Sequence, residues 1–285
     1  MEQSFINKIK YIKMSAHYLS LAACLLVFFA CNGNKKEALA ALEKAKTLYE
    51  NAQYSAAKQT LCDLQTQYPR EVELLKEALH LTRQIELKEQ ERNFFFCDSL
   101  LIIRQAEVDS IRQYFVLEKN PEYDVAGRYI EKKAAASSYS MRIQTGINES
   151  GDMYLKSVYK GKTPIRHNQL KISTSAGEYA QTEIIPFDGG ANYTFKDDNT
   201  GLIYEIVTYQ KGRDNGLIRF IYNYSTQKLT AQYLGGKTYS FVLTSPEVES
   251  LVKTLNFSTM LLDIQKLQKE KAKAEKRVQY IQSKL

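Results

Sequence analysis

The sequence has few of the residues from which most enzyme sites are built. Its 285 residues include 3 histidines and 4 cysteines and no tryptophan. No G-x-S-x-G nucleophile turn, glycine-rich phosphate loop, H-E-x-x-H or C-x-x-C motif occurs in it. These absences argue against the serine hydrolases, nucleotide-binding enzymes and zinc enzymes that carry such motifs. We therefore expect a protein that is not an enzyme, with no catalytic residue, no metal and no cofactor.

The sequence also lacks an apolar run long enough for a membrane-spanning helix, which needs about 20 residues. The apolar run near the start, Tyr18–Ala30, has 13 residues and follows a segment that carries Lys8, Lys10 and Lys13. This length and the basic segment before it are typical of a secretory signal peptide. Translation could start at Met1 or at Met14, because the shorter leader keeps the whole apolar run.

The end of this run gives a more specific prediction. Ala30 and Cys31 resemble the lipobox of bacterial lipoproteins, although the two phenylalanines before them are unusual there. The resemblance implies that residues 1–30 are a signal peptide, that Cys31 is the lipid attachment site, and that residues 31–36 form a lipidated tether. The expected location is the cell envelope, on the outer membrane facing the periplasm, because no acidic cluster follows Cys31. A short anchor helix with an incidental cysteine is the alternative.

The charge pattern excludes another class of partner. The formal net charge is +7, and the basic residues are spread widely rather than gathered in one patch. A nucleic-acid-binding surface needs such a patch. We therefore expect no nucleic acid partner, and contact with the membrane through the lipid anchor.

Residues 37–68 predict a helical hairpin. Apolar residues recur at helical spacing in two runs: Leu39, Leu42, Ala45 and Leu48, then Tyr54, Ala57, Leu61 and Leu64. The hairpin resembles one tetratricopeptide repeat, because small, aromatic, small, large and proline residues occupy the places usual in that family: Ala45, Tyr54, Ala57, Leu61 and Pro69. No second copy is present, and an unrelated amphipathic hairpin explains the same pattern.

Two long helices are predicted on either side of the chain's middle. Residues 71–119 keep helical spacing, with a break expected near 88–93, where a charged stretch shifts the apolar register. The second helix starts at the capping box formed by Thr244 and Glu247 and continues to Leu285 with a heptad repeat. We expect the two helices to pack antiparallel, with homodimerisation through the C-terminal helix as the alternative. Cys62 and Cys97 fall in helical patterns, so a disulfide between them requires the break.

The middle of the chain, 137–243, predicts antiparallel β-structure. Tyr, Thr, Ile and Val concentrate there between recurrent turn signals. A tight hairpin with a two-residue loop is expected at Gly235–Gly236. The strand candidates are Tyr139–Ile147, Met153–Tyr159, Leu170–Thr174, Tyr179–Ile185, Asn192–Phe195, Leu202–Tyr209, Leu217–Tyr224, Lys228–Leu234 and Lys237–Leu243.

Together these patterns predict an α+β protein. An antiparallel β-sandwich or barrel-like domain is inserted between an N-terminal helical hairpin with a long helix and a C-terminal coiled-coil helix. The expected divisions are a signal peptide (1–30), a tether (31–36), a helical part (37–136), a β domain (137–243) and a C-terminal helix that packs with the N-terminal helical part (244–285).

Two residues stand out as candidates for ligand binding. Arg166 and His167 are predicted to lie in a loop between strands, beside Lys162, where they could contact an anion or a glycan. The function expected first is a non-catalytic envelope lipoprotein that acts as a protein–protein interaction or assembly module with an unknown protein partner. The alternatives are a glycan- or peptide-binding lipoprotein that uses tyrosines of the β domain and, third, a hydrolase.

Overall fold

The computed structural model describes residues 34–119, 127–136 and 141–285. The chain is α+β, with long helices and two antiparallel sheets. It divides into two compact units, one formed by Met1–Phe96 with Glu270–Leu285 and the other by Cys97–Lys269. The predicted signal peptide and Cys31 lie outside the described residues. None of the described helices combines the length and the apolar character that a membrane crossing requires.

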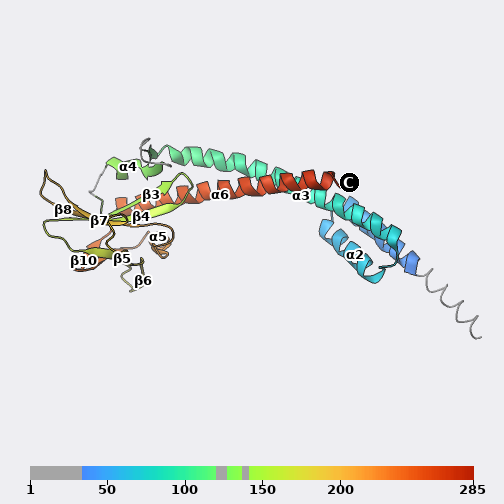
Figure 1. The fold of residues 1–285 in the computed structure, drawn as a ribbon, viewed down its shortest axis with the longest axis horizontal. Coiled ribbons are helices and arrows are strands. Elements are labelled where there is room, and N and C mark those ends of the chain that lie inside the picture. Colours follow the sequence, from blue (N-terminus) through green and yellow to red (C-terminus); the bar gives the residue numbers. More distant parts are fainter. Residues whose placement is uncertain (1–33, 120–126, 137–140) are drawn as a thin grey trace, which may run out of the picture. The chain divides into compact units, whose positions relative to one another are not determined.

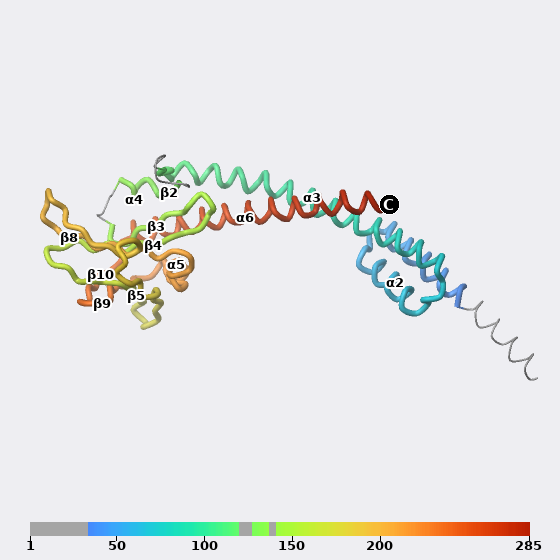
Figure 2. The backbone as a smooth tube through the Cα atoms, in the orientation of Figure 1, coloured from blue at the N-terminus to red at the C-terminus, as the bar shows by residue number. Residues whose placement is uncertain are grey.

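Three helical segments form the core of the first unit. They are a helix over residues 34–50, α2 (Tyr54–Gln67) and the first part of α3 (Val72–Arg112) (Figure 2, blue to cyan). The first two lie where the sequence predicts a hairpin, and residues 34–36 of the predicted tether are already helical. Ala45 and Ala57 are fully buried, and these small side chains allow the two helices to approach closely.

The helix α3 is continuous, so the predicted break near 88–93 is wrong. The charged stretch there consists of Lys, Glu, Gln and Arg, which favour helix, and Lys88 also pairs with Glu91 three residues later, at 3.0 Å. Cys62 and Cys97 are both free. With no break in α3, the condition for a disulfide between them is not met.

The C-terminal helix α6 (Ser245–Gln282) begins at the predicted capping box. The Glu247 carboxylate accepts a hydrogen bond from the Thr244 backbone N–H at 2.8 Å, and the Glu247 N–H lies 3.4 Å from the Thr244 hydroxyl. In the first unit α6 runs antiparallel to α3. There Arg277 pairs with Glu86 at 2.8 Å, and Arg83 donates to the Lys284 carbonyl at 2.8 Å.

The second unit contains both sheets. The six-stranded sheet has the order β1 (Phe115–Glu118), β2 (Arg128–Glu131), β3 (Ile143–Asn148), β4 (Met153–Gly161), β8 (Ile203–Tyr209), β7 (Asn192–Lys196). The four-stranded sheet has the order β10 (Tyr239–Val242), β9 (Thr230–Gly235), β5 (His167–Ser173), β6 (Tyr179–Gln181). β1 and β2 were not among the predicted strands. The residues of β1 were predicted to be helical, because the predicted helix extended to residue 119. A short helix, α4 (Lys132–Ala136), follows β2.

One predicted strand is a helix. Residues Leu217–Asn223 form α5, which packs beside β5 and β6 (Figure 1). The residues buried on it are Leu217, Ile218 and Ile221, a spacing that fits a helix face rather than strand alternation. The chain enters α5 through Gly216, whose φ of 79° only glycine adopts at no cost. The aromatic and β-branched residues of this segment suggested a strand. Their intrinsic preference for strands is weak, and the burial of their side chains in the folded protein determines the structure instead.

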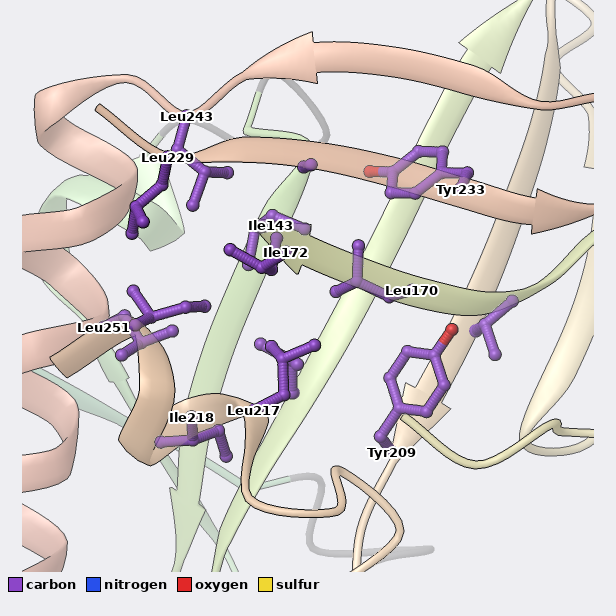
Figure 3. Packing of buried hydrophobic residues seen from close by; sticks show 14 of the residues in the cluster. Ile143, Leu170, Ile172, Tyr209, Leu217, Ile218, Leu229, Tyr233, Leu243 and Leu251 are labelled. Carbon is purple, nitrogen blue, oxygen red and sulfur yellow. The ribbon is translucent and has the colours of Figure 1, made fainter. Parts of the chain in front are cut away.

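The main core takes side chains from both sheets and from α5 and α6. Figure 3 shows residues of the six-stranded sheet (Ile143, Tyr209), of the four-stranded sheet (Leu170, Ile172, Tyr233) and Leu251 of α6 directed toward one another. A second cluster joins α3, β1, β3 and α6 through Val108, Phe115, Ile147, Phe257 and Ile264. The six-stranded sheet is therefore buried against the long helices near β1 and against the other sheet near β4 and β8.

The predicted hairpin at Gly235–Gly236 exists, but its loop is longer than two residues. Tyr233 pairs with Tyr239, so the turn lies between these residues. The glycines serve a different purpose. A Cβ atom on Gly235 would lie 2.4 Å from the Arg166 carbonyl oxygen, and one on Gly236 would lie 2.8 Å from that of Ile165. Only glycine lets this loop approach the start of β5.

Candidate functional site

A chain of buried polar side chains connects the two sheets. The Ser157 hydroxyl of β4 lies 2.9 Å from Nε2 of His167 on β5, and Nδ1 of His167 lies 2.9 Å from the Glu205 carboxylate of β8. The exposed fractions of these three residues are 0%, 0% and 1%. The His167 ring also stacks on Tyr233, with 4.5 Å between ring centroids.

The loop before β5 is folded around the Glu205 carboxylate. Backbone N–H groups of Ile165 and Arg166 each donate to Oε1 at 2.8 Å, and the N–H of His167 donates to Oε2 at 3.1 Å. Three consecutive N–H groups converge on one anion because Arg166 has a φ of 54°, which is rare for a residue other than glycine. The strain at Arg166 is therefore explained by the binding of a carboxylate from its own chain.

These contacts determine the charge state of the site. Burial alone would raise the pKa of Glu205, but the hydrogen bonds from the His167 ring and from the N–H groups of Arg166 and His167 outweigh it and lower that pKa. Glu205 is therefore ionised at neutral pH. Its carboxylate accepts the proton on Nδ1 of His167, and Nε2 of the same ring forms a hydrogen bond with the Ser157 hydroxyl.

A serine, a histidine and a carboxylate in this order have the geometry of an acyl-transfer triad. However, Ser157 lies inside a strand rather than on an exposed turn, and no substrate carbonyl can approach a hydroxyl that is fully buried. The hydroxyl also has a second neighbour, the Tyr209 hydroxyl at 3.4 Å. Burial raises the pKa of Tyr209 to about 12, so its phenol stays neutral. The arrangement satisfies buried polar groups and links the sheets.

The two residues singled out from the sequence do not share a surface. His167 is the first residue of β5 and is buried, whereas Arg166 is exposed. The expectation that His167 lies in a surface loop is therefore wrong, because its ring hydrogen-bonds inward to Ser157 and Glu205. Sequence reasoning missed these two partners. The signal available for Glu205 was its place in the strand sequence IYEIVTY, where a lone acid is surrounded by apolar residues.

The candidate for contact with another molecule is an open apolar groove in the second unit. Its volume is about 780 Å³, and α3 contributes most of its lining, with Met260 of α6 on one side. Ile102 and Ile103 are 70% and 58% exposed. At its rim Arg104 donates to Glu107 at 2.6 Å. The lining residues are Ile102, Ile103, Ala106, Glu107, Ser110, Ile111, Tyr114 and Met260. We call this surface the α3 groove.

The first unit has a smaller groove between α2 and α3. Its volume is about 410 Å³, and exposed Val72 and Leu79 contribute apolar surface to it. Lys58, at its edge, pairs with Glu89 at 2.8 Å. Both units therefore carry an apolar groove along α3, and the groove of the second unit is larger and more open.

A row of aromatic rings lies on β7 and β8. The rings of Tyr193, Phe195 and Tyr204 are stacked nearly parallel, with 6.3 Å and 5.0 Å between successive centroids, and Phe195 is exposed. Lys160 lies over the Tyr204 ring at 5.3 Å. Tyr204 is buried, so the exposed ring of this row is that of Phe195.

The described residues contain no group of three or more His, Cys, Asp and Glu side chains that could hold a metal ion. Comparison with known proteins found no family model, no curated protein and no solved structure that matches the chain.

Proposed function

We propose that this protein is a non-catalytic lipoprotein of the cell envelope, anchored through Cys31 and acting as a docking or assembly module for another protein. The leader sequence supports the location in the cell envelope, and the α3 groove supports the docking role. The outer membrane facing the periplasm remains the proposed location. The buried position of Ser157 argues against the hydrolase alternative.

The α3 groove is the observation that carries the docking role. Ile102 and Ile103 expose large apolar side chains on the same helix that buries Val108, and exposed Tyr114 lies in the turn directly after this helix. Each exposed aliphatic side chain of this size forgoes about 1.5–3 kcal/mol of burial free energy. Contiguous exposed apolar groups of this kind are typical of protein interaction sites.

The shape of the groove indicates the kind of partner. Its lining follows one helix over about three turns and is completed by a residue of a second helix, Met260. A groove between two helices accepts the apolar face of a third helix through side chains at i, i+3, i+4 and i+7. We therefore propose that the partner presents an amphipathic helix.

Site-specific photo-crosslinking in cells tests this proposal. A photoreactive amino acid at Ser110, in the groove, should capture a partner. Capture should fall at least tenfold in Ile102→Glu and Ile103→Glu, because a carboxylate cannot enter an apolar interface without losing its hydration. Ser99→Glu, exposed on the same helix but outside the groove, is the matched control. Equal capture in all variants, or no capture at all, would contradict the docking role.

The anchor is tested separately. Cys31→Ser should move the protein from the membrane fraction to the soluble fraction and abolish labelling by a radioactive fatty acid. Continued lipid labelling of the variant would contradict the assignment of Cys31 as the lipid attachment site.

A second function is favoured by one observation, the stacked row of Tyr193, Phe195 and Tyr204. Parallel aromatic faces can stack on a sugar ring or on a peptide side chain. Under this alternative the β-sheet face binds a glycan or a peptide, and Phe195→Ala should weaken binding to a glycan array at least tenfold. Tyr179→Ala, which removes an exposed ring elsewhere, should not. The same array signal for both variants would exclude the aromatic row.

We also infer that the two sheets form a sandwich rather than a barrel. The shared core and the hydrogen bond from β4 to β5 through Ser157 and His167 support opposed faces. A solved structure in which hydrogen bonds join the edges of the two sheets into one closed barrel would contradict this.

A further inference from the structure

The edge of the six-stranded sheet at β1 has the features of a pairing surface. Among the described strands β1 has a neighbour, β2, on one side only. Val116 and Leu117, its middle residues, are 39% and 46% exposed. The strand lies entirely in the second unit, directly after the α3 groove residue Tyr114.

The register shows which backbone groups of β1 point away from β2. The Lys132 N–H donates to the Tyr114 carbonyl at 2.9 Å, and in this antiparallel register Phe115 faces Glu131 and Val116 faces Ile130. Hydrogen-bonded and non-hydrogen-bonded pairs alternate along an antiparallel ladder. Residues 114, 116 and 118 therefore bond to β2, and the N–H and C=O groups of Phe115 and Leu117 point to the outer edge.

Among the described residues, β1 carries no lysine, proline or bulge to protect its outer edge, and its only charged residue, Glu118, lies at its end. Exposed edge strands commonly carry lysine, proline or a bulge, which discourage pairing with another chain. The opposite edge strand of the sheet, β7, contains Lys196. The middle of β1 instead has two uncharged apolar residues, Val116 and Leu117, and its pairing with β2 runs without a bulge.

We propose that β1 pairs antiparallel with β1 of a second copy of this chain, about a two-fold axis at Val116. Phe115 then faces Leu117 of the second copy, and the two such pairs exchange four backbone hydrogen bonds. Val116 faces Val116 of the second copy, with about 4.5 Å between their Cα atoms, as in other non-hydrogen-bonded pairs. The exposed side chains of Val116 and Leu117 become covered.

The sequence of β1 favours a second copy over an unrelated strand. About this axis Tyr114 faces Glu118 of the second copy, so the two carboxylates of the strand lie at opposite ends and do not repel each other. A two-fold pairing also stops at a dimer. Each copy uses its β1 edge once, so no free β1 edge remains to add a third copy. This pairing is independent of the docking role proposed for the α3 groove.

Cysteine crosslinking of the purified full chain tests the register. In a background in which the four cysteines of the chain (Cys24, Cys31, Cys62 and Cys97) are replaced by Ser, Val116→Cys places two thiols opposite each other, within the Cα separation that a disulfide accepts. Mild oxidation should convert most of the chain to a covalent dimer. Thr194→Cys, on the exposed edge strand β7 in the same background, should crosslink at least tenfold less. Equal crosslinking, or a covalent product with a different protein, would overturn the proposal.

Charge variants provide a second test that does not depend on disulfide chemistry. Val116→Lys and Val116→Glu each place like charges across the axis, and each should halve the mass measured by light scattering in detergent. Mixing the two variants should restore the mass of two chains, because opposite charges then face each other. A wild-type chain with the mass of one copy, or a mixture that stays monomeric, would overturn the pairing.

Discussion

Two regions of the second unit treat polar and apolar groups in opposite ways. Between the sheets, the polar side chains of Ser157, His167 and Glu205 are withdrawn from water and fully hydrogen-bonded to one another and to the backbone. In the α3 groove, apolar side chains such as Ile102 and Ile103 are exposed to water. The comparison teaches that side chains arranged like a catalytic set are here buried and link the two sheets, whereas the surface that we propose for docking is apolar and exposed.

The largest loss of stability is expected on substitution of Glu205. The Glu205 carboxylate accepts four hydrogen bonds, two on each oxygen. Glu205→Gln replaces one of these oxygens by an NH₂ group, which then faces two N–H donors instead of accepting from them. Leaving buried donors unpaired in this way should lower the free energy of unfolding by about 3–5 kcal/mol. Urea denaturation measures the change. Glu183→Gln, at an exposed position, should change it by less than about 0.5 kcal/mol, and an equally small effect at Glu205 would show that the network carries no stability.

The pH dependence of stability follows from the lowered pKa of Glu205. Its ordinary value is 4.5, and the folded protein holds it below this. Ionised Glu205 therefore contributes stability that is fully present above about pH 4.5 and is lost as the pH falls through the lower folded pKa. Over this acid range the stability of the wild-type chain should fall more steeply than that of Glu205→Gln. Parallel curves would mean that Glu205 has the same pKa in the folded and unfolded chains.

A smaller loss is expected at Ser157. Ser157→Ala removes the hydroxyl that is hydrogen-bonded to Nε2 of His167 and leaves this nitrogen without that partner in a site without exposed surface. The expected cost is about 1–3 kcal/mol in the free energy of unfolding. The result also separates the two interpretations of the triad geometry. If the wild-type chain hydrolysed an activated ester and Ser157→Ala abolished this with unchanged stability, the structural role would be wrong.

Parts of the fold were accessible from sequence because they depend on neighbours along the chain. The start of α6 is an example, since Thr244 and Glu247 interact within one helical turn. Leu217–Asn223 was predicted wrongly because five of its seven residues are apolar or aromatic and suit either a strand or a helix, and only packing against the sheets decides between them.

The buried network was inaccessible for a different reason. Ser157 and His167 are 10 residues apart and His167 and Glu205 are 38 apart, on strands of two different sheets. Their meeting depends on β4 pairing with β8, a strand distant in sequence. The α3 groove was hidden as well, since helical spacing identifies the buried stripe around Val108 but not which other apolar residues stay exposed.

The smallest effect on stability is expected in the α3 groove. There an exposed apolar residue, Ile103, can be compared with a buried one, Val108, on the same helix. Ile103→Ser removes a side chain that is already in contact with water, so the free energy of unfolding should change by no more than about 0.5 kcal/mol. Val108→Ser, five residues later and fully buried between α3 and the sheet, should cost about 2 kcal/mol or more, because it creates a cavity and buries a hydroxyl. Urea denaturation of both variants gives the two values. If Ile103→Ser proved as costly as Val108→Ser, Ile103 would be part of the core, and the α3 groove could not be a free docking surface. A small stability change together with lost partner capture is the result that assigns Ile103 to binding.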